Sequence, residues 1–360
     1  NVPNLRFPEF EGEWEICKLS DLCTFFSGGT PNSSNKDFYG GKIAFIRSGE
    51  LHANKTELFV TQKGFESSSA KMVDVGDLLL AMYGATSGDI AISKIKGAIN
   101  QAILCIRTKQ NKKFIESVWN KHVSKILMKY LQGGQGNLST DIVKSLSFSF
   151  PTLAEQERIA KLMALLDERI STQNKIIDKL QSLIKGITQN IVRYNKANVR
   201  LSDCLSCSSS TLQESDVSEH GTYPVYGANG VVGYLDNYNT ENEAIYIIKD
   251  GSGVGSTSYV TGKCSATGTL NILRAKEGYS LQYLYYMLKV FNFEPYKTGM
   301  AIPHIYFKDY GKAKVFCPTY KEQLQYARLL SAIDKRLTVE HGLLTSLSLQ
   351  KQYLLRQMFI

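Results

Sequence analysis

A glycine-rich stretch, Gly251-Ser-Gly-Val-Gly255, has the spacing of a loop that could bind phosphate. Backbone N–H groups in such turns can surround a phosphate, and P-loops continue with Lys-Ser or Lys-Thr and a helix. Here Ser-Thr-Ser-Tyr follows, which does not indicate a helix. We therefore interpret the stretch as a tight turn between strands. Its glycines allow close backbone approach, and its serines can contact phosphates or base edges.

A second stretch, Cys204-Leu-Ser-Cys207, has the spacing of a zinc-binding or redox pair. A structural zinc site needs four ligands, and no second Cys pair or His pair follows at a suitable distance. We therefore predict ordinary cysteines at the start of a domain and no metal site.

The sequence also lacks the motifs of the enzymes that act on DNA or nucleotides. It contains no NPPY or DPPY methyltransferase motif, no G-x-x-x-x-G-K-[ST] and no H-E-x-x-H. We predict no catalytic residue and no cofactor bound by this chain.

The candidate functional residues are instead polar side chains on predicted loops, where amide, basic and hydroxyl groups could contact phosphates or base edges. For the amides the alternative is capping of the loop itself, and for tyrosine it is interior packing. The candidates are Thr86, Asn100, Gln101, Gln132, Gln135, Asn137, Tyr226, Asn229, Lys249, Ser252, Ser256, Lys297 and His304.

The composition agrees with a polyanionic partner but does not prove one. The 360 residues carry a formal charge of +9, which favours nucleic acid, although many proteins are equally basic. No apolar run is long enough to span a membrane, and no basic-then-apolar leader is present. Seven cysteines, an odd number, indicate reduced thiols, so we expect a cytoplasmic protein.

The positions of these candidates follow from an internal repeat with an offset of 167 residues, the difference between 318 and 151. The stretch from Phe150 to Ile170 reappears from Cys317 to Leu337 without a gap. The glycine stretch also has a counterpart, Gly84-Ala-Thr-Ser-Gly88, and Asn137 aligns with His304. Similarity fades in the first half of each copy. A duplicated chain can fold with approximate two-fold symmetry, which suits two half-sites on DNA.

Each copy ends in a long predicted helix with a heptad seam. Apolar residues recur at steps of three and four, which is the pattern of helices that pair in a coiled coil. Lys351 departs from the seam of the second copy. The seam residues are Ile159, Met163, Leu166, Ile170, Ile177, Leu180, Ile184, Ile187 and Ile191, then Tyr326, Leu330, Ile333, Leu337, Leu344, Leu347, Leu354 and Met358.

One seam position is polar in both copies, Gln173 in the first and Glu340 in the second. Gln173 lies beside the midpoint of a helix from Glu155 to Val192. If the helices pair antiparallel about a two-fold axis, equivalent residues meet only where that axis crosses. We therefore predict that Gln173 and Glu340 approach each other and fix the register of the coiled coil. The alternative is that they lie on a solvated edge.

These patterns together predict an α+β protein with two mixed domains and two long helices. We place the first domain at 1–150 and its helical spacer at 151–198. The second domain covers 199–316, and the second spacer covers 317–360. The helices should form an antiparallel coiled coil with pseudo-two-fold symmetry.

The duplicated P-x-x-x-E-Q segments, Pro151 to Gln156 and Pro318 to Gln323, carry a family resemblance. Over its full length the chain resembles the DNA-specificity subunit of type I restriction–modification systems. The opening stretch from Pro3 to Phe10 and the pairing of Val225-Tyr-Gly-Ala-Asn-Gly230 with the glycine stretch add to it.

This resemblance implies a non-catalytic subunit with two target recognition domains. Each domain would read half of a split double-stranded DNA sequence. The helices would set the spacing and dock two methyltransferase subunits, and through them the restriction subunits. S-adenosylmethionine, ATP and Mg would belong to those partners, and no membrane is implied. Two alternatives stay open: an enzyme that acts on DNA alone, and a structural coiled-coil protein that dimerises and binds DNA without sequence preference.

Overall fold

The computed structural model describes residues 2–131, 137–299 and 301–360, which form two compact units. Unit 1 comprises Asn1–Thr172 and Leu344–Ile360, and unit 2 comprises Gln173–Leu343. This division differs from the four predicted segments because both long helices contribute to both units. The assignment of 1–150, 151–198, 199–316 and 317–360 as separate domains and spacers stays a prediction.

Unit 1 is a mixed domain of short strands with one twenty-residue helix, α3, and its expected α+β class is confirmed. Its strands are β1 (Glu15–Lys18), β2 (Cys23–Ser27), β3 (Tyr39–Ile46), β4 (Phe59–Val60), β5 (Lys71–Val73), β6 (Leu78–Ala81), β7 (Ile90–Ile92), β8 (Gly97–Ile99), β9 (Ile103–Thr108) and β10 (Ser147–Phe150). Its helices are α1 (Leu19–Leu22), α2 (Gln62–Glu66), α3 (Lys112–Leu131) and α4 (Thr140–Ser145).

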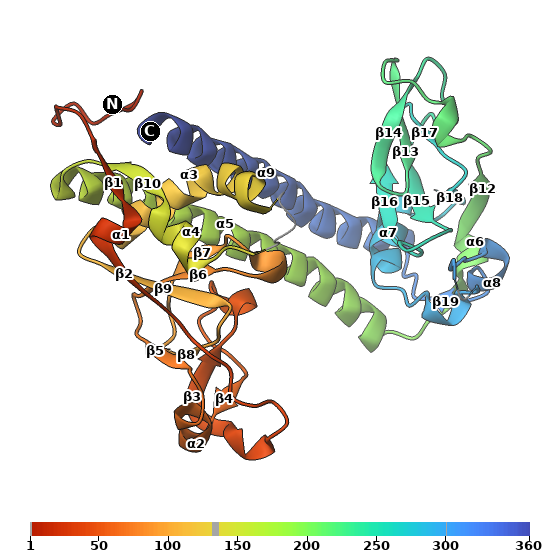
Figure 1. The fold of residues 1–360 in the computed structure, drawn as a ribbon. Coiled ribbons are helices and arrows are strands. Elements are labelled where there is room, and N and C mark those ends of the chain that lie inside the picture. Colours follow the sequence, from red (N-terminus) through yellow and green to blue (C-terminus); the bar gives the residue numbers. More distant parts are fainter. Residues whose placement is uncertain (1, 132–136, 300) are drawn as a thin grey trace. The chain divides into compact units, whose positions relative to one another are not determined.

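Unit 2 repeats this plan with a shorter domain helix, α7 (Figure 1). Its strands are β11 (Val199–Arg200), β12 (Leu205–Ser209), β13 (Tyr223–Gly227), β14 (Gly230–Leu235), β15 (Ala244–Ile248), β16 (Thr257–Val260), β17 (Ser265–Ala266), β18 (Leu270–Ala275) and β19 (Lys314–Val315). Its helices are α6 (Leu201–Cys204), α7 (Leu281–Lys289) and α8 (Phe307–Tyr310).

The central sheets of the two units have the same topology. The strand order is β2-β9-β6-β7 in unit 1 and β12-β18-β15-β16 in unit 2. The register is also shared, since Leu78 pairs with Ile106 and Ile245 pairs with Leu273, both shifted by 167 residues. The duplication therefore extends upstream of the long helices to the central sheets, whereas the second sheets differ: their order is β4-β3-β8-β5 in unit 1 and β14-β13-β17 in unit 2.

Buried apolar runs explain why these strands occupy the sheet centres. All four residues of β6 are fully buried, because β7 and β9 flank the strand and the domain core covers both faces. Four residues of β15, from Ala244 to Ile247, are equally buried. A continuous apolar run is the expected sequence of a strand that has no solvent face.

The long helices are α5 (Leu153–Tyr194) and α9 (Tyr320–Met358). In unit 1 the start of α5 packs against the end of α9, and Ile159 and Met163 share a core with Met358. In unit 2 the end of α5 packs against the start of α9, where Ile184 shares a core with Leu330. Within each unit the two helices therefore run antiparallel (Figure 1). The predicted seam residues are all buried or half-buried.

The polar residues of the seam meet in unit 2. Gln173 and Glu340 are only 5% and 2% exposed, which excludes the solvated-edge alternative. The Gln173 side-chain amide donates to the Glu340 backbone carbonyl at 3.0 Å and also to its carboxylate. Arg336 forms an ion pair with the same carboxylate from one turn away. The predicted approach is thus observed, whereas the role of this pair in fixing register stays a prediction.

Lys351 departs from the apolar seam because it takes part in an ion-pair network in unit 1. Its Nζ lies 2.5 Å from Asp167 Oδ1, and Lys113 of α3 contacts the other oxygen of that carboxylate at 2.5 Å. Burial would raise the pKa of Asp167, but hydrogen bonds from both lysines lower it overall. The network therefore joins α3, α5 and α9.

The duplicated glutamines Gln156 and Gln323 connect each domain helix to a long helix, a role that we did not anticipate. The side-chain N–H of Gln156 donates to the Pro151 carbonyl, five residues earlier in the chain, at 2.9 Å. Its side-chain oxygen accepts from the backbone N–H of Asn111, the N-cap of α3, at 3.2 Å. Gln323 makes the same two bonds, to Pro318 at 2.9 Å and from Ser280, the N-cap of α7, at 2.9 Å. Gln156 and Gln323 are separated by the 167-residue offset of the repeat, and this was the sequence signal for their shared role.

No helix among the described residues combines the length and the apolar composition that crossing a membrane requires.

Replacing Gln173 by Leu should lower the thermal midpoint of unfolding by several degrees at pH 7, because a buried carboxylate loses its donor. The hydrogen bond from Gln173 lowers the pKa of Glu340 from its ordinary value of 4.5. A carboxyl with a lowered pKa contributes stability above its ordinary pKa, and this contribution is lost as the pH falls. Thermal melts of wild type and Q173L should therefore converge in acid.

The double variant Q173L/E340L should regain stability, since an apolar pair suits the seam, and Asn174→Leu on the exposed surface is the control. Equal midpoints of wild type and Q173L at pH 7 would contradict the assigned contribution of this pair.

Candidate nucleic-acid interface

The two glycine stretches form loops of the same construction, one in each unit. Gly84–Gly88 joins β6 to β7, and Gly251–Gly255 joins β15 to β16, which confirms the predicted turn between strands. The Gly88 N–H donates to the carbonyl of residue 81 at 2.8 Å, and the Gly255 N–H donates to that of residue 248 at 2.9 Å. Each unit therefore presents one tight glycine loop at an equivalent position.

Glycine is required at the last position of both loops. Gly88 and Gly255 have φ angles of 87° and 92°, which favour residues without a Cβ. A Cβ would also lie 2.8 Å from Val123 in unit 1 and 2.9 Å from Phe293 in unit 2. The backbone thus turns back against the domain wall, whereas Gly84 and Ala85 in one loop and Ser252 in the other are exposed.

A second segment lies beside each loop, at the two aligned positions Asn137 and His304. The Leu138 N–H donates to the Met82 carbonyl at 3.0 Å, and the Ile305 N–H donates to the Lys249 carbonyl at 2.9 Å. The two donors, and likewise the two acceptors, are 167 residues apart. The structure therefore gives Asn137 and His304 equivalent places next to the loops.

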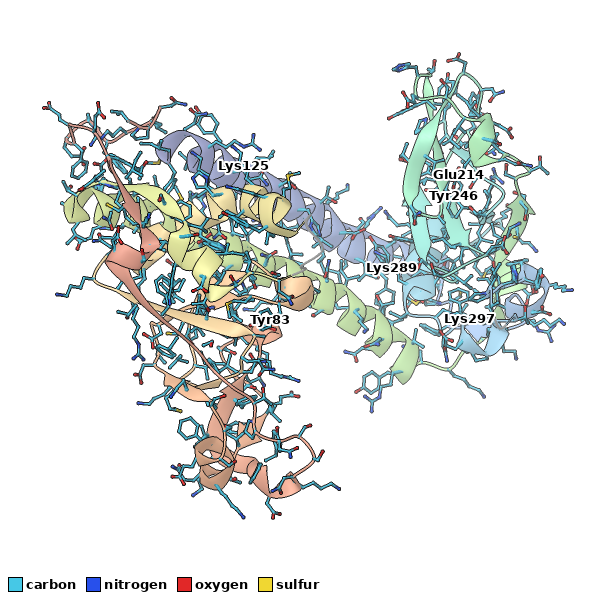
Figure 2. The ribbon with its side chains drawn as sticks, in the orientation of Figure 1. Tyr83, Lys125, Glu214, Tyr246, Lys289 and Lys297 are labelled. Atoms are coloured by element: carbon cyan, nitrogen blue, oxygen red, sulfur yellow. The ribbon has the colours of Figure 1, made fainter. Side chains whose placement is uncertain are left out.

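In unit 2 the fold gathers several predicted residues around the loop. Ser252 and Ser256 are exposed, and Ser256 and Lys297 line one cleft of about 350 Å³. Lys297 is held by Glu294 at 2.6 Å. The cleft also contains Lys289, which sequence reasoning missed because its position at the end of α7 gives no local signal (Figure 2). Hydroxyl and ammonium groups in one cleft can bind phosphate oxygens.

His304 lies in the segment that precedes α8 and pairs with Asp250 beside the loop. Its Nδ1 is 2.7 Å from Oδ1 of Asp250, the residue immediately before the loop. Both side chains are 36% exposed, so a ligand can reach the imidazole. Asp250 was not among the predicted residues.

Unit 1 contains a different histidine–aspartate pair beside its loop. His52 Nε2 lies 2.8 Å from Oδ1 of Asp89, the residue immediately after Gly88. This hydrogen bond is the main reason that the pKa of His52 is raised, so the imidazole carries a positive charge up to a higher pH than usual. Neither residue was predicted, since His52 comes from a distant part of the chain.

The remaining described candidates of unit 1 have other local roles or are only partly exposed. Asn100 accepts from the Ala102 N–H at 3.2 Å, which matches the loop-capping alternative, and exposed Gln101 accepts from Thr30 at 2.5 Å. Thr86 lies in the loop and is half-buried. Gln132 and Gln135 lie outside the described residues.

Two candidates of unit 2 lie on the neighbouring hairpin. The Tyr226 ring packs against interior Tyr246 with centroids 5.8 Å apart, which matches the interior alternative for this tyrosine. Asn229 is exposed in the turn between β13 and β14. Within the described residues, no hydrogen bond joins either side chain to the glycine loop.

The cysteine stretch forms no metal centre. Cys204 is buried in α6 beside Cys317, whereas Cys207 lies on β12 opposite Leu273. Across the described part of the chain, no cluster of His, Cys, Asp and Glu has the geometry to hold a metal ion.

The chain thus contains two similar α+β domains, and each carries a glycine loop and packs on the paired long helices. This arrangement defines the class of proteins with an internally duplicated domain. The sequence matches the family of the type I restriction modification DNA specificity domain twice, over residues 11–182 and 195–349. The chain belongs to this family, and the predicted resemblance is confirmed.

Several curated proteins are similar in sequence. The type I restriction enzyme EcoprrI specificity subunit of Escherichia coli is 21% identical and is aligned over 90% of this chain and 88% of its own length. The MjaIX specificity subunit of Methanocaldococcus jannaschii is 25% identical, with alignment over 47% of this chain and 42% of that protein. The chain thus spans less than half the length of the latter relative.

Solved structures share the fold. The S subunit of a type I restriction–modification system from M. genitalium has a TM-score of 0.71 with 17% identity, covering 100% of this chain and 99% of that chain. A chain from a study of complex assembly and conformational transition of the type I R-M system has a TM-score of 0.53 with 16% identity.

Replacing Gly88 or Gly255 by Ala should lower the free energy of unfolding by about 1–2 kcal/mol or more, from the positive φ alone. The close contacts of the added Cβ increase this loss. Gly186 in α5 has no atom within 4 Å of an added Cβ, so Gly186→Ala should instead stabilise by about 0.5–1 kcal/mol. Urea unfolding of the three variants measures both effects, and a neutral Gly88→Ala would contradict the first.

Proposed function

We propose that this chain is the DNA-specificity subunit of a type I restriction–modification system. Each recognition domain reads one half of a split DNA sequence, and the helix pair sets the distance between the halves. The observation that carries this proposal is the occurrence of two equivalent glycine loops on two domains whose central sheets share topology and register. Two related but diverged readers suit a target with two different halves.

The chain acts without catalysis of its own. Its sequence contains no methyltransferase, P-loop or zinc-protease motif, which supports a role in binding. S-adenosylmethionine, ATP and Mg belong to the partner subunits, and the assembled complex acts in the compartment that holds the DNA.

We also propose that the paired helices dock methyltransferase subunits. Ile176 and Leu343 are 37% and 39% exposed, and each lies three residues after a member of the central polar pair. Equal spacing from that pair places both on one face of the helix pair. Leu183 and Val339 continue this face in unit 2 and are also exposed. Exposed aliphatic residues in a row favour a protein partner over DNA.

A map of methylated bases in cells that express this chain with type I methyltransferase subunits tests the function. We expect one motif with two specific halves and an unspecific spacer. Exchanging residues 1–150 for those of another family member should change only one half. A continuous motif, or changes in both halves, would contradict independent readers. Binding without sequence preference would favour a structural coiled-coil protein instead.

Replacing Ile176 and Leu343 together by Lys should weaken assembly with the methyltransferase subunits by about tenfold or more, since each buried aliphatic side chain contributes roughly 1.5–3 kcal/mol. Asn174→Lys, an exposed polar position of the same helix, is the matched control. Size-exclusion chromatography with light scattering measures assembly, and unchanged assembly of the double variant would remove this face as the docking surface.

A further inference from the structure

His304 is held more firmly than an ordinary loop histidine. Its backbone N–H donates to the Thr298 carbonyl at 2.7 Å, and its carbonyl accepts from Thr298 at 2.9 Å. The preceding residue, Pro303, accepts from the Gly251 N–H at 3.0 Å. The side chain is fixed by the 2.7 Å contact between its Nδ1 and Asp250. Backbone and ring are therefore both anchored to the glycine loop.

The edge of the ring that carries Nε2 is kept clear by a glycine. Gly299 has a φ of 87°, and a Cβ there would lie 3.3 Å from His304 Cδ2, which is bonded to Nε2. The same Cβ would lie 2.4 Å from the Ile302 carbonyl oxygen. Any larger residue at 299 would therefore strain the backbone and crowd this edge of the imidazole.

The aspartate decides which ring nitrogen carries the hydrogen. An ionised carboxylate only accepts hydrogen bonds, so Nδ1 must donate to Asp250. In the neutral imidazole, Nε2 is then an acceptor. In the major groove, adenine and cytosine present exocyclic amino donors, whereas guanine and thymine present acceptors at the corresponding positions. An acceptor at Nε2 therefore favours adenine or cytosine and is repelled by guanine O6 or thymine O4.

We propose that His304 reads the exocyclic amino group of an adenine or cytosine in one half of the target, and that Asp250 is the positioning residue that makes Nε2 the acceptor. The proposal rests on the proposed DNA-reading function and adds the residue, the atom and the class of base. Lys289, Lys297 and Ser256 line the cleft beside the end of the glycine loop and are the groups suited to phosphates.

The first test measures base discrimination with the chain assembled with methyltransferase subunits. The probes are duplexes of the mapped target in which each recognised position is replaced by the other bases. For His304→Ala, preference for an amino-bearing base should fall on the order of tenfold or more at one position of one half. The other half should be unaffected. His220→Ala, at an exposed histidine of unit 2 outside the glycine loop, is the matched control and should leave the base preferences of both halves unchanged.

The second test measures the tautomer of the ring directly. The chain has five histidines, so ¹⁵N-histidine labelling gives few signals, and His304→Gln identifies the one that belongs to His304. In wild type this ring should carry its hydrogen on Nδ1 when neutral. Asp250→Ala should shift the hydrogen toward Nε2 and reduce base discrimination. Asp250→Asn keeps an acceptor oxygen and should restore much of both.

The outcomes separate this inference from the function on which it rests. If wild type yields no split motif, the proposed function fails. If wild type yields one but folded His304→Ala and His304→Gln keep every base preference, the reading role of His304 is wrong. A uniform loss of affinity for all duplexes, with a weaker salt dependence, would make His304 a phosphate contact and overturn the proposal. Thermal melts establish that each variant is folded.

Discussion

The burial of one apolar seam between α5 and α9 is the constraint on which the other features depend. A helix with a heptad stripe is unstable alone in water and must cover that stripe. Here the stripe of α5 is covered by α9 in both units, from Met163 in unit 1 to Ile184 in unit 2. The polar pair Gln173 and Glu340 interrupts the stripe of both helices at the same level. The predicted role of this pair in fixing register rests on the general behaviour of buried polar pairs, which satisfy their hydrogen bonds in only one alignment of the helices.

The domains are attached to these helices by polar contacts that the duplication preserved. Gln156 and Gln323 each bind the N-cap backbone of a domain helix, so the start of a long helix and the start of a domain helix are joined at one point. Unit 1 adds the ion-pair network of Asp167, Lys113 and Lys351. Unit 2 has buried Ile184 in the place that corresponds to Lys351. The carboxylate equivalent to Asp167 is Asp334, which accepts a hydrogen bond from the Tyr286 hydroxyl of α7 at 3.4 Å. The joint therefore uses lysines in unit 1 and a neutral hydroxyl in unit 2.

The glycine loops show how a conserved frame can carry different chemistry. Their backbone hydrogen bonds are the same in both units, because the positive φ angles and the close domain wall leave the chain little freedom. The side chains at their margins differ. Unit 1 places a His52–Asp89 pair after its loop, and unit 2 places an Asp250–His304 pair before it. Fixed backbone and variable side chains are what two readers of unlike half-sites require.

Much of the architecture could be predicted because it depends on local periodicity. The seam from Ile159 to Ile191 has a period that only a helix can bury on one face. The main strands of both domains, such as β6 and β15, are short apolar runs with turns on either side. Even the contact between Gln173 and Glu340 follows from a repeat offset and simple geometry. These features need no knowledge of distant partners.

The candidate site was predicted only in part, because its members come from separate parts of the chain. Asn137 and His304 could be found by their shared offset, and the structure gives them equivalent places. Asn100 and Tyr226 instead serve the loop and the interior, which their residue types alone could not reveal. His52, Asp89 and Lys289 have no local signal that marks them.

The duplication, the helix seam and the turns follow from spacing and residue type along a continuous chain, so they can be recognised without coordinates. Which imidazole faces which carboxylate, and which amide contacts the start of a domain helix, depends on how distant segments pack in the folded chain. Asp250 and His304 are 54 residues apart, and their 2.7 Å contact exists because two backbone segments pair beside a glycine loop. Such contacts form only when the packed core brings together segments that are far apart in the chain. The secondary-structure propensity of each segment does not show which distant segment it will meet.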